Sequence, residues 1–386
     1  MLWGVAVRFC AKFRLYRLAS YASTKRMPHS TDASPGDREV LGRSRLAADR
    51  IRREIIEETF PAGSQLPTFD ALVDAHGLSR ATMQAVIRQL KHDGFVRSVH
   101  RSGLFVADHP PHLHRFGLAF ADHPGGENWN RFYGALLAES AVVARQHAGV
   151  EIVPFYGLKP DVENGERSRL REDLRHQRLA GLIVTGGTSF LLRAPERDEG
   201  LVPAVAINHS ESVTSGAPVV NTDDPLLLTK AFAWLAERRR RRVAVVAMRS
   251  PTGATVERCA AAGLQTRPHW LCPIGHGYAD QVRVVVRLLL DYPEAERPDA
   301  LVVATDNLVE EALAAIHGTG LVIGRDLDVV AHCNWPWPVE SPLPIARLGF
   351  HSHHFLHACL EAIRDQRQGR TPLHCKRVPA LFEHEL

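Results

Sequence analysis

The sequence predicts an α/β protein with two parts: an N-terminal winged helix-turn-helix, then a larger two-lobed domain built on parallel sheets. Two observations lead to this prediction. Between Pro61 and Val106, helix caps, glycines and apolar residues follow the order of two short helices and a hairpin. Beyond residue 112, near-continuous apolar runs alternate with amphipathic helices, which is typical of parallel strands covered on both faces.

The chain divides into four segments: residues 1–40, 41–107, 108–112 and 113–386. Residues 1–26 are apolar but interrupted by Arg8, Lys12, Arg14 and Arg17, so they lack the uncharged core of a signal peptide. We interpret them as a mis-called start with translation from Met27, the alternative being a basic amphipathic helix on a membrane surface. Residues 28–40 are rich in Pro, Ser, Asp and Gly and are predicted to be disordered. Residues 108–112 are interpreted as a linker.

The helices of the small domain are predicted from their caps. Thr68 can accept hydrogen bonds from the exposed amides of a helix over Phe69–His76, which Gly77 ends. Ser79 can cap a second helix over Arg80–His92. Apolar residues at helical spacing would pack the two helices together: Leu72, Val73, Leu78, Met83, Val86, Ile87 and Leu90.

A two-stranded hairpin follows the second helix. Gly94 stops that helix, and Phe95–Val99 and Leu104–Val106 are predicted as strands around a turn at His100–Gly103. A helix-turn-helix followed by such a hairpin, or wing, places one helix in the DNA major groove.

The segment from Arg45 to Val106 resembles the DNA-binding head of the GntR family of bacterial transcription regulators. The matching residues are Pro61-Ala62-Gly63, Leu66-Pro67, Leu78-Ser79-Arg80-Ala81-Thr82, Leu90, Gly94-Phe95 and Gly103-Leu104-Phe105-Val106. The resemblance implies a DNA-contacting set, which is Thr68, Ser79, Arg80, Thr82, Gln84, Arg88, His100 and Arg101. The alternative interpretation is that Arg80 and Arg88 are solvated charges on a helix face.

Two positions depart from the family's pattern. Gln84 stands where the family usually has arginine, and Arg101 replaces the first glycine of the wing. Because arginine favours the edge of guanine and glutamine that of adenine, we expect an operator that differs from the family's usual core.

The larger domain alternates strands and helices along the chain. Strands are predicted at Arg115–Ala121, Val150–Tyr156, Gly181–Gly186, Val202–Asn208, Arg242–Met248, Trp270–Ile274, Ala300–Ala304 and Leu327–His332. Helices are predicted at Trp129–Gln146, Arg167–Gln177, Pro225–Glu237, Asp280–Leu290 and Leu308–His317.

Residues 113–384 resemble the effector domain of the LacI family, which shares its fold with type I periplasmic sugar-binding proteins. The resemblance lies in GLIVTGG (Gly181–Gly187), VVNTDD (Val219–Asp224), PDALVVATDN (Pro298–Asn307), the run Gly320–Val330 and Val378–Leu381. It implies a small-molecule site between two lobes, at the carboxyl ends of the strands.

The resemblance also implies which residues face the ligand: Thr185, Asn208, Tyr278, Thr305, Asp306, Cys333 and Asn334. Where the family has a sugar-gripping aspartate, this chain has Ala331-His332-Cys333 followed by Asn334, and the nearest arginine to the family's conserved one is Arg258. Without those charged groups, we expect a different or less polar ligand, or loss of effector binding.

Composition limits the other possibilities. The net charge of +4 is uneven: residues 41–107 carry ten basic and seven acidic side chains, whereas residues 108–386 sum to about −3. A basic head on an acidic body is typical of a phosphate-binding module joined to a domain that does not bind polyanions. The six cysteines are scattered without a CxxC pair, which favours a reducing cytoplasm, and no apolar run reaches the ~20 residues of a membrane span.

His353 and His357 lie one helical turn apart, but no third ligand is fixed by spacing, so we expect neither a metal site nor a cofactor. The sequence therefore predicts a cytoplasmic, homodimeric transcription repressor that binds a pseudo-palindromic DNA operator and responds to a small-molecule effector. One alternative is an enzyme, because GntR heads also occur fused to pyridoxal-phosphate domains. Such a domain needs a lysine for the Schiff base, and Lys159, Lys230 and Lys376 of the larger domain lie in no matching context. The other is a small-molecule sensor whose head no longer reads DNA.

Overall fold

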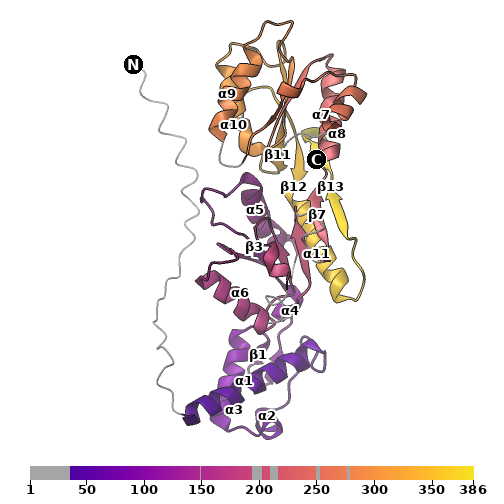
Figure 1. Cartoon of the computed structure of the whole chain (residues 1–386). Helices are drawn as coiled ribbons and strands as arrows, with labels where there is room; N and C mark the ends of the chain where they lie inside the picture. The colour runs from indigo at the N-terminus through magenta and orange to yellow at the C-terminus, as the bar shows by residue number, and fades with distance from the viewer. Residues whose placement is uncertain (1–34, 148, 194–201, 209–215, 249–252, 276–278) are drawn as a thin grey trace, which may run out of the picture.

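The computed structural model describes residues 35–147, 149–193, 202–208, 216–248, 253–275 and 279–386. Three units follow one another along the molecule: the head (residues 35–106), a first lobe (the N-lobe) and a second lobe (the C-lobe) (Figure 1). Each lobe is built on a six-stranded sheet. The predicted α/β fold with an N-terminal winged helix-turn-helix is confirmed.

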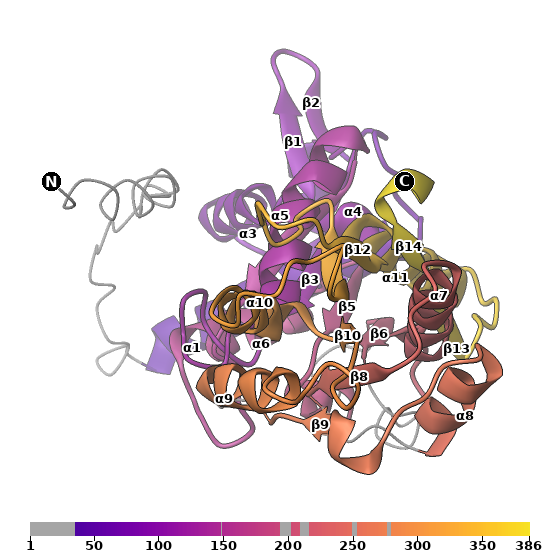
Figure 2. The ribbon, with the colours of Figure 1, turned by 90° about the horizontal axis from the view of Figure 1, so that it is seen from above.

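The head contains α1 (Pro35–Ile56), α2 (Phe69–His76), α3 (Arg80–His92), β1 (Val96–Val99) and β2 (Gly103–Val106). The predicted caps are confirmed, since Thr68 accepts a hydrogen bond from the Ala71 amide and Ser79 accepts one from the Thr82 amide. Gly77 ends α2 in the left-handed conformation, at φ 59°, which favours glycine. The β1–β2 hairpin extends away from the lobes when the molecule is viewed along its length (Figure 2).

Helix α1 was not predicted, and it begins at Pro35 within the stretch expected to be disordered. Among the α1 residues whose side chains are described (42–56), the buried face is formed by Ala47, Ala48, Ile51, Arg52 and Ile55, packed against α3. Such a narrow apolar face in a charged segment gives a weak periodic signal. The expected linker at residues 108–112 also differs, because the short helix α4 (Pro111–His114) begins inside it.

The N-lobe sheet has the order β13-β7-β6-β5-β3-β4, with every neighbouring pair parallel. Its strands are β3 (Arg115–Ala119), β4 (Glu151–Phe155), β5 (Gly181–Val184), β6 (Ala204–Ile207), β7 (Val219–Thr222) and β13 (Cys375–Val378). Its helices are α5 (Arg131–Gln146), α6 (Gly165–Arg175) and α11 (Ser352–Arg367).

The C-lobe sheet has the order β14-β12-β11-β10-β8-β9, and only its edge strand β14 is antiparallel. Its strands are β8 (Val243–Ala247), β9 (Leu271–Pro273), β10 (Ala300–Val303), β11 (Asp328–Trp335), β12 (Ala346–His351) and β14 (Ala380–Phe382). Its helices are α7 (Asp224–Glu237), α8 (Gly253–Ala261), α9 (Ala279–Leu290) and α10 (Val309–His317). The sequence reading missed α8 and β12.

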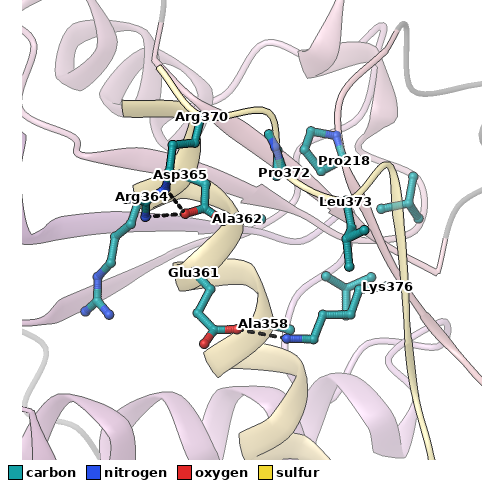
Figure 3. Close-up of a pocket in the computed structure, with 12 residues that line it drawn as sticks. Pro218, Ala358, Glu361, Ala362, Arg364, Asp365, Arg370, Pro372, Leu373 and Lys376 are labelled. Atoms are coloured by element: carbon teal, nitrogen blue, oxygen red, sulfur yellow. Dashed lines mark hydrogen bonds and ion pairs between the residues drawn. The ribbon is translucent and has the colours of Figure 1, made fainter. Parts of the chain in front are cut away.

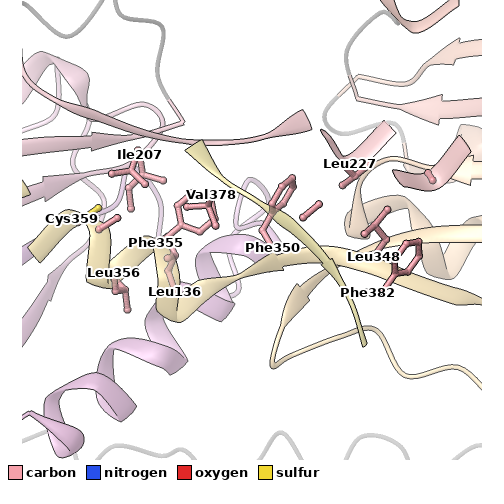
Figure 4. Packing of buried hydrophobic residues seen from close by; sticks show 14 of the residues in the cluster. Leu136, Ile207, Leu227, Leu348, Phe350, Phe355, Leu356, Cys359, Val378 and Phe382 are labelled. Carbon is pink, nitrogen blue, oxygen red and sulfur yellow. The ribbon is translucent and has the colours of Figure 1, made fainter. Parts of the chain in front are cut away.

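The chain crosses between the lobes three times: from β7 to α7, from β12 to α11, and from β13 to β14. One hydrophobic core runs through these crossings. It joins Leu136 and Ile207 of the N-lobe to Leu348 and Phe382 of the C-lobe through Phe355 (Figure 4). The strands of each parallel sheet therefore end close to the crossings, where an open α/β fold places its ligands.

Candidate DNA-binding surface and effector site

The start of α3 presents polar side chains to solvent. Ser79, Arg80, Gln84 and Arg88 are exposed, whereas Met83 is fully buried. The Ser79 and Thr82 hydroxyl groups are 2.8 Å apart, and Ser79 already serves as the cap. The amphipathic pattern thus leaves one face of the helix free to enter a groove, as the resemblance implied.

Arg80 is not a freely extended side chain. Its guanidinium pairs with the Asp70 carboxylate and lies 5.3 Å from the centre of the Phe69 ring. Both charged side chains are about two-thirds exposed, so this ion pair is weak. The Asp70 carboxylate therefore offsets the charge of Arg80, the arginine predicted to contact the groove. No sequence motif marks Asp70.

The tip of the wing is an exposed turn that contains His100 and Arg101. Arg101 adopts φ 60°, the left-handed region that favours glycine, at the position where the family has glycine. The Gln65 side chain supports the turn by donating a hydrogen bond to the Ser102 carbonyl at 2.8 Å. The arginine therefore occupies a glycine conformation at the edge of the surface that would meet DNA.

In the C-lobe, three of the predicted effector residues lie together. The Asn334 side-chain amide donates to the Asp306 carboxylate, and the Asp306 amide donates to His332 Nδ1 at 3.1 Å. Thr305 precedes Asp306 and is partly exposed. Burial raises the pKa of Asp306 despite the nearby His332, and burial lowers the pKa of His332. A buried carboxyl group whose pKa is raised by burial, despite the nearby His332 and Arg131, is suited to exchange hydrogen bonds with a ligand.

Cys333 does not belong to this cluster. It alternates with His332 and Asn334 along β11, it is 1% exposed, and burial raises the pKa of its thiol. The expectation that it faces the effector is not met by its place in the interior. The Asn334 Oδ1 atom, by contrast, is buried with no hydrogen-bond partner among the described residues.

In the N-lobe, Thr185 follows β5 and is fully buried, where its hydroxyl donates to the Ala119 carbonyl at 2.8 Å. Asn208 follows β6, is exposed, and accepts a hydrogen bond from the Thr222 amide at 3.0 Å. Both side chains are engaged by the N-lobe itself. Tyr278, the seventh predicted residue, lies outside the described residues.

The sequence reading missed an aromatic cluster in the N-lobe. The rings of Phe120, Trp129, Tyr133 and Tyr156 contact one another with centroid distances of 5.0–6.1 Å. The Tyr133 hydroxyl donates to the Gly186 carbonyl at 3.2 Å, directly after the GLIVT strand. Trp129 and Tyr133 lie one helical turn apart at the start of α5, but Phe120 follows β3 and Tyr156 follows β4, so no local sequence pattern reveals the whole cluster.

The start of α5 joins the two lobes. The Arg131 amide donates to Asn307 Oδ1 at 3.0 Å, and the Arg131 side chain forms an ion pair with Glu310 at 2.6 Å. Asn130 caps the helix by accepting from the Tyr133 amide. The aromatic cluster and the Asp306 cluster are therefore brought to the same junction between the lobes.

Two cavities lie elsewhere. One, of about 380 Å³, lies between α11 and the segment before β13 (Figure 3). Four of its five charged side chains form ion pairs, Glu361 with Lys376 and Asp365 with Arg370. The other, of about 400 Å³, lies beside α8 and Trp270. Neither cavity contains a predicted effector residue.

Two of the three histidines of α11 lie beside carboxylates. His353 lies 3.2 Å from Glu139, and His357 lies 3.5 Å from Glu361. Among the described residues, no group of three or more His, Cys, Asp or Glu side chains is arranged to hold a metal ion. No helix in the described ranges is both long and apolar enough to cross a membrane.

Two family models match this chain. Residues 44–106 match "Bacterial regulatory proteins, gntR family", and residues 232–381 match "Periplasmic binding protein-like domain". Solved structures similar to the chain include a regulatory protein of LacI family from Chloroflexus aggregans, with TM-score 0.52 and 20% identity, covering 69% of this chain and 96% of that one. A transcriptional regulator CelR–cellobiose complex has TM-score 0.51 and 21% identity, covering 82% and 98%.

Curated relatives match the head. HTH-type transcriptional regulator Rv0792c of Mycobacterium tuberculosis is 36% identical over 61 residues, which are 16% of this chain and 23% of that protein. The repressor MngR of the mannosyl-D-glycerate transport/metabolism system of Escherichia coli is 38% identical over 64 residues, 17% and 27% respectively. The matched region spans about a quarter of each relative.

The fold and these matches define a two-part protein in which a DNA-binding head precedes a two-lobed ligand-binding fold. More particularly, the chain carries a gntR-family DNA-binding domain joined to a periplasmic-binding-protein-like domain, as its motifs indicated.

Proposed function

We propose that this protein is a cytoplasmic transcription repressor that binds a pseudo-palindromic operator as a homodimer and responds to a small molecule bound between its lobes. The observation that carries the proposal is the exposed polar start of α3, next to the wing, in a chain that also carries a two-lobed ligand-binding fold. A ligand can control DNA binding only by favouring one arrangement of the lobes over another.

Sequence would be read by Arg80 and Gln84, with Ser79, Thr82, Arg88 and the wing contacting phosphates. The test is selection of genomic fragments by the purified full-length chain at near-physiological salt. We expect an enriched palindrome with half-sites about one DNA turn (~34–36 Å) apart. Arg80→Ala should weaken specific binding by ~1–3 kcal/mol, and Gln84→Arg should shift the preferred base from adenine towards guanine.

The effector is proposed to be a sugar-like molecule. The aromatic cluster offers apolar ring faces, while Asp306 and the unpartnered Asn334 Oδ1 offer acceptors for hydroxyl groups. The similar CelR structure is a cellobiose complex. Cellobiose and a panel of monosaccharides can be tested by thermal shift, because a ligand at 100 times its Kd stabilises a protein by ~2.7 kcal/mol. Asp306→Asn and Tyr133→Phe should reduce that shift.

A second candidate is a small-molecule sensor whose head no longer reads DNA. The Asp70–Arg80 pair favours this candidate, because it places a carboxylate where DNA phosphates would approach. Asp70→Ala decides between the two. If the head reads DNA, removing the Asp70 carboxylate should strengthen phosphate binding but leave the selected sequence recognisable. If the head is degenerate, neither wild type nor Asp70→Ala should enrich any site.

A further inference from the structure

A buried carboxylate at the end of α3 joins the head to the N-lobe. Asp93 follows the last residue of α3, and its side chain is only 3% exposed. The Asp93 carboxylate accepts a hydrogen bond from the Arg52 guanidinium of α1 at 2.6 Å and one from the Arg178 guanidinium of the N-lobe at 3.0 Å. Burial by itself would raise the pKa of Asp93, but the hydrogen bond from Arg52 and the charges of Arg52 and Arg178 outweigh it and lower that pKa.

The charge chain continues into the N-lobe. Arg178 lies 2.8 Å from Asp173, and Asp173 accepts a hydrogen bond from Arg115, the first residue of β3, at 3.0 Å. The chain Arg52–Asp93–Arg178–Asp173–Arg115 therefore alternates in sign from the interior of the head to the first strand of the N-lobe. Its members are mostly buried, with exposed fractions between 2% and 20%.

The connection between head and lobe is packed as well. The ring of His112 in α4 stacks on Phe95 of the head, with centroids 5.6 Å apart and planes 3° from parallel. The His112 carbonyl accepts a hydrogen bond from Arg367 at the end of α11. Phe95 is fully buried and His112 is 5% exposed. The segment that the sequence predicted as a linker is thus part of a closed interface.

We propose that the head and the N-lobe move as one rigid body, and that Arg178 is the residue that positions the head. Rotating the head away would break the hydrogen bond between Asp93 and Arg178 and the stacking of His112 on Phe95, and would expose the packed interface to water. It follows, on the proposed function, that the dimeric body rather than a flexible linker fixes the distance between two heads. Arg178 then determines which half-site spacing the protein accepts.

Arg178→Ala tests this inference with little risk to the fold. In this variant Asp93 keeps Arg52, and Asp173 keeps Arg115. Arg175→Ala is the matched control, because Arg175 ends α6 on the same lobe, is exposed and lies three positions away. Circular dichroism of both full-length variants checks that secondary structure is retained.

The first readout is selection of operators from a library in which one half-site sequence is held and the spacing varies. Wild type and Arg175→Ala should select a single spacing, whereas Arg178→Ala should accept several spacings while preferring the same half-site sequence. An equally sharp preference in Arg178→Ala would overturn the proposal.

The second readout needs no DNA. Calorimetry of the full-length chain should show the head unfolding together with the N-lobe in wild type, and as a separate earlier transition in Arg178→Ala. Identical transitions in the two proteins would overturn rigid docking. If wild type selects no DNA at all, the proposed function fails, while calorimetry still decides whether the head is docked.

Discussion

The N-lobe has two junctions, one with the head and one with the C-lobe. Each contains a buried carboxyl group, and the two groups have pKa values shifted in opposite directions. At the junction with the head, Asp93 is held between Arg52 and Arg178, and its pKa is lowered. At the junction with the C-lobe, Asp306 accepts a hydrogen bond from the Asn334 amide and lies near His332 and the charge of Arg131, but burial outweighs these and raises its pKa.

The rest of each junction follows the same division. The head junction adds a stacked pair and buried ion pairs. The lobes share a hydrophobic core at the crossings, but the ion pair between them, Arg131–Glu310, has side chains that are 43% and 64% exposed. Exposed ion pairs contribute little to stability, whereas breaking a buried pair is costly. On the proposed function, we expect the head to stay fixed to its lobe and the two lobes to change their closure around a ligand.

The strongest way to break the comparison is Asp93→Asn. Because it leaves Arg52 and Arg178 facing a neutral amide, we expect opening of α1 and α3 to become easier by ~3–5 kcal/mol. Native-state hydrogen exchange of their amides measures this. Asp49→Asn is the control: Asp49 contacts the same Arg52 but is 42% exposed, so a change of ~0–1 kcal/mol is expected. Equal effects of the two substitutions would contradict the special role of Asp93.

The head junction should also weaken with acid. Burial and the charge of Arg367 lower the pKa of His112 from 6.5 to about 4. The unfolded state binds this proton more readily than the folded state. The contribution of neutral His112 to the free energy of unfolding is therefore complete above pH ~6.5 and is lost as pH falls towards 4. The loss amounts to roughly 2 kcal/mol by pH 5. His176, whose pKa burial and nearby arginines also lower, acts in the same direction.

His112→Phe isolates this contribution, since the ring can still stack on Phe95 and the buried Nδ1 atom has no partner to lose. We expect the variant to keep more of its stability between pH 7 and pH 5 than wild type in denaturant titrations. A pH dependence that matches wild type would mean that His112 is not buried in its neutral form.

At the junction between the lobes, replacing the buried aspartate by asparagine should not destabilise the protein as we expect at Asp93. Asp306→Asn removes a buried charge without removing the side-chain oxygen that accepts from Asn334, a hydrogen bond of about 1 kcal/mol. We therefore expect the variant to be at least as stable as wild type at pH 7 by thermal denaturation, while responding less to sugars. A large loss of stability would show that the carboxylate is held by the fold rather than kept for a ligand.

The smallest effect is expected at the exposed Arg131–Glu310 ion pair between the lobes. Arg131→Ala and Glu310→Ala should each change stability by less than ~1 kcal/mol. Both should shift the lobes towards an open arrangement, seen as a larger radius of gyration in X-ray scattering. A double-mutant cycle measures their coupling; a coupling of several kcal/mol would make this junction as rigid as that of the head.

Much of the fold could be read from local sequence. The caps Thr68 and Ser79 gave the bounds of α2 and α3 without error, because a cap satisfies amides within its own helix turn. The buried strands were found because they are apolar along their whole length. Helix α1 was missed since its buried face consists of two alanines, two isoleucines and an arginine, Arg52.

The sites were less accessible to sequence. Local motifs and the family resemblance pointed to Asp306, Cys333 and Asn334, whose role in effector binding stays a prediction; the alternation of side chains along β11 separates Cys333 from His332 and Asn334. Asp93 and Arg178 are 85 residues apart, and the aromatic cluster comes from several segments. The sequence alone determined which elements form and what kind of protein they build, because those signals act within a few residues. Only the tertiary structure decided which charges are paired and buried, because that depends on how distant elements pack.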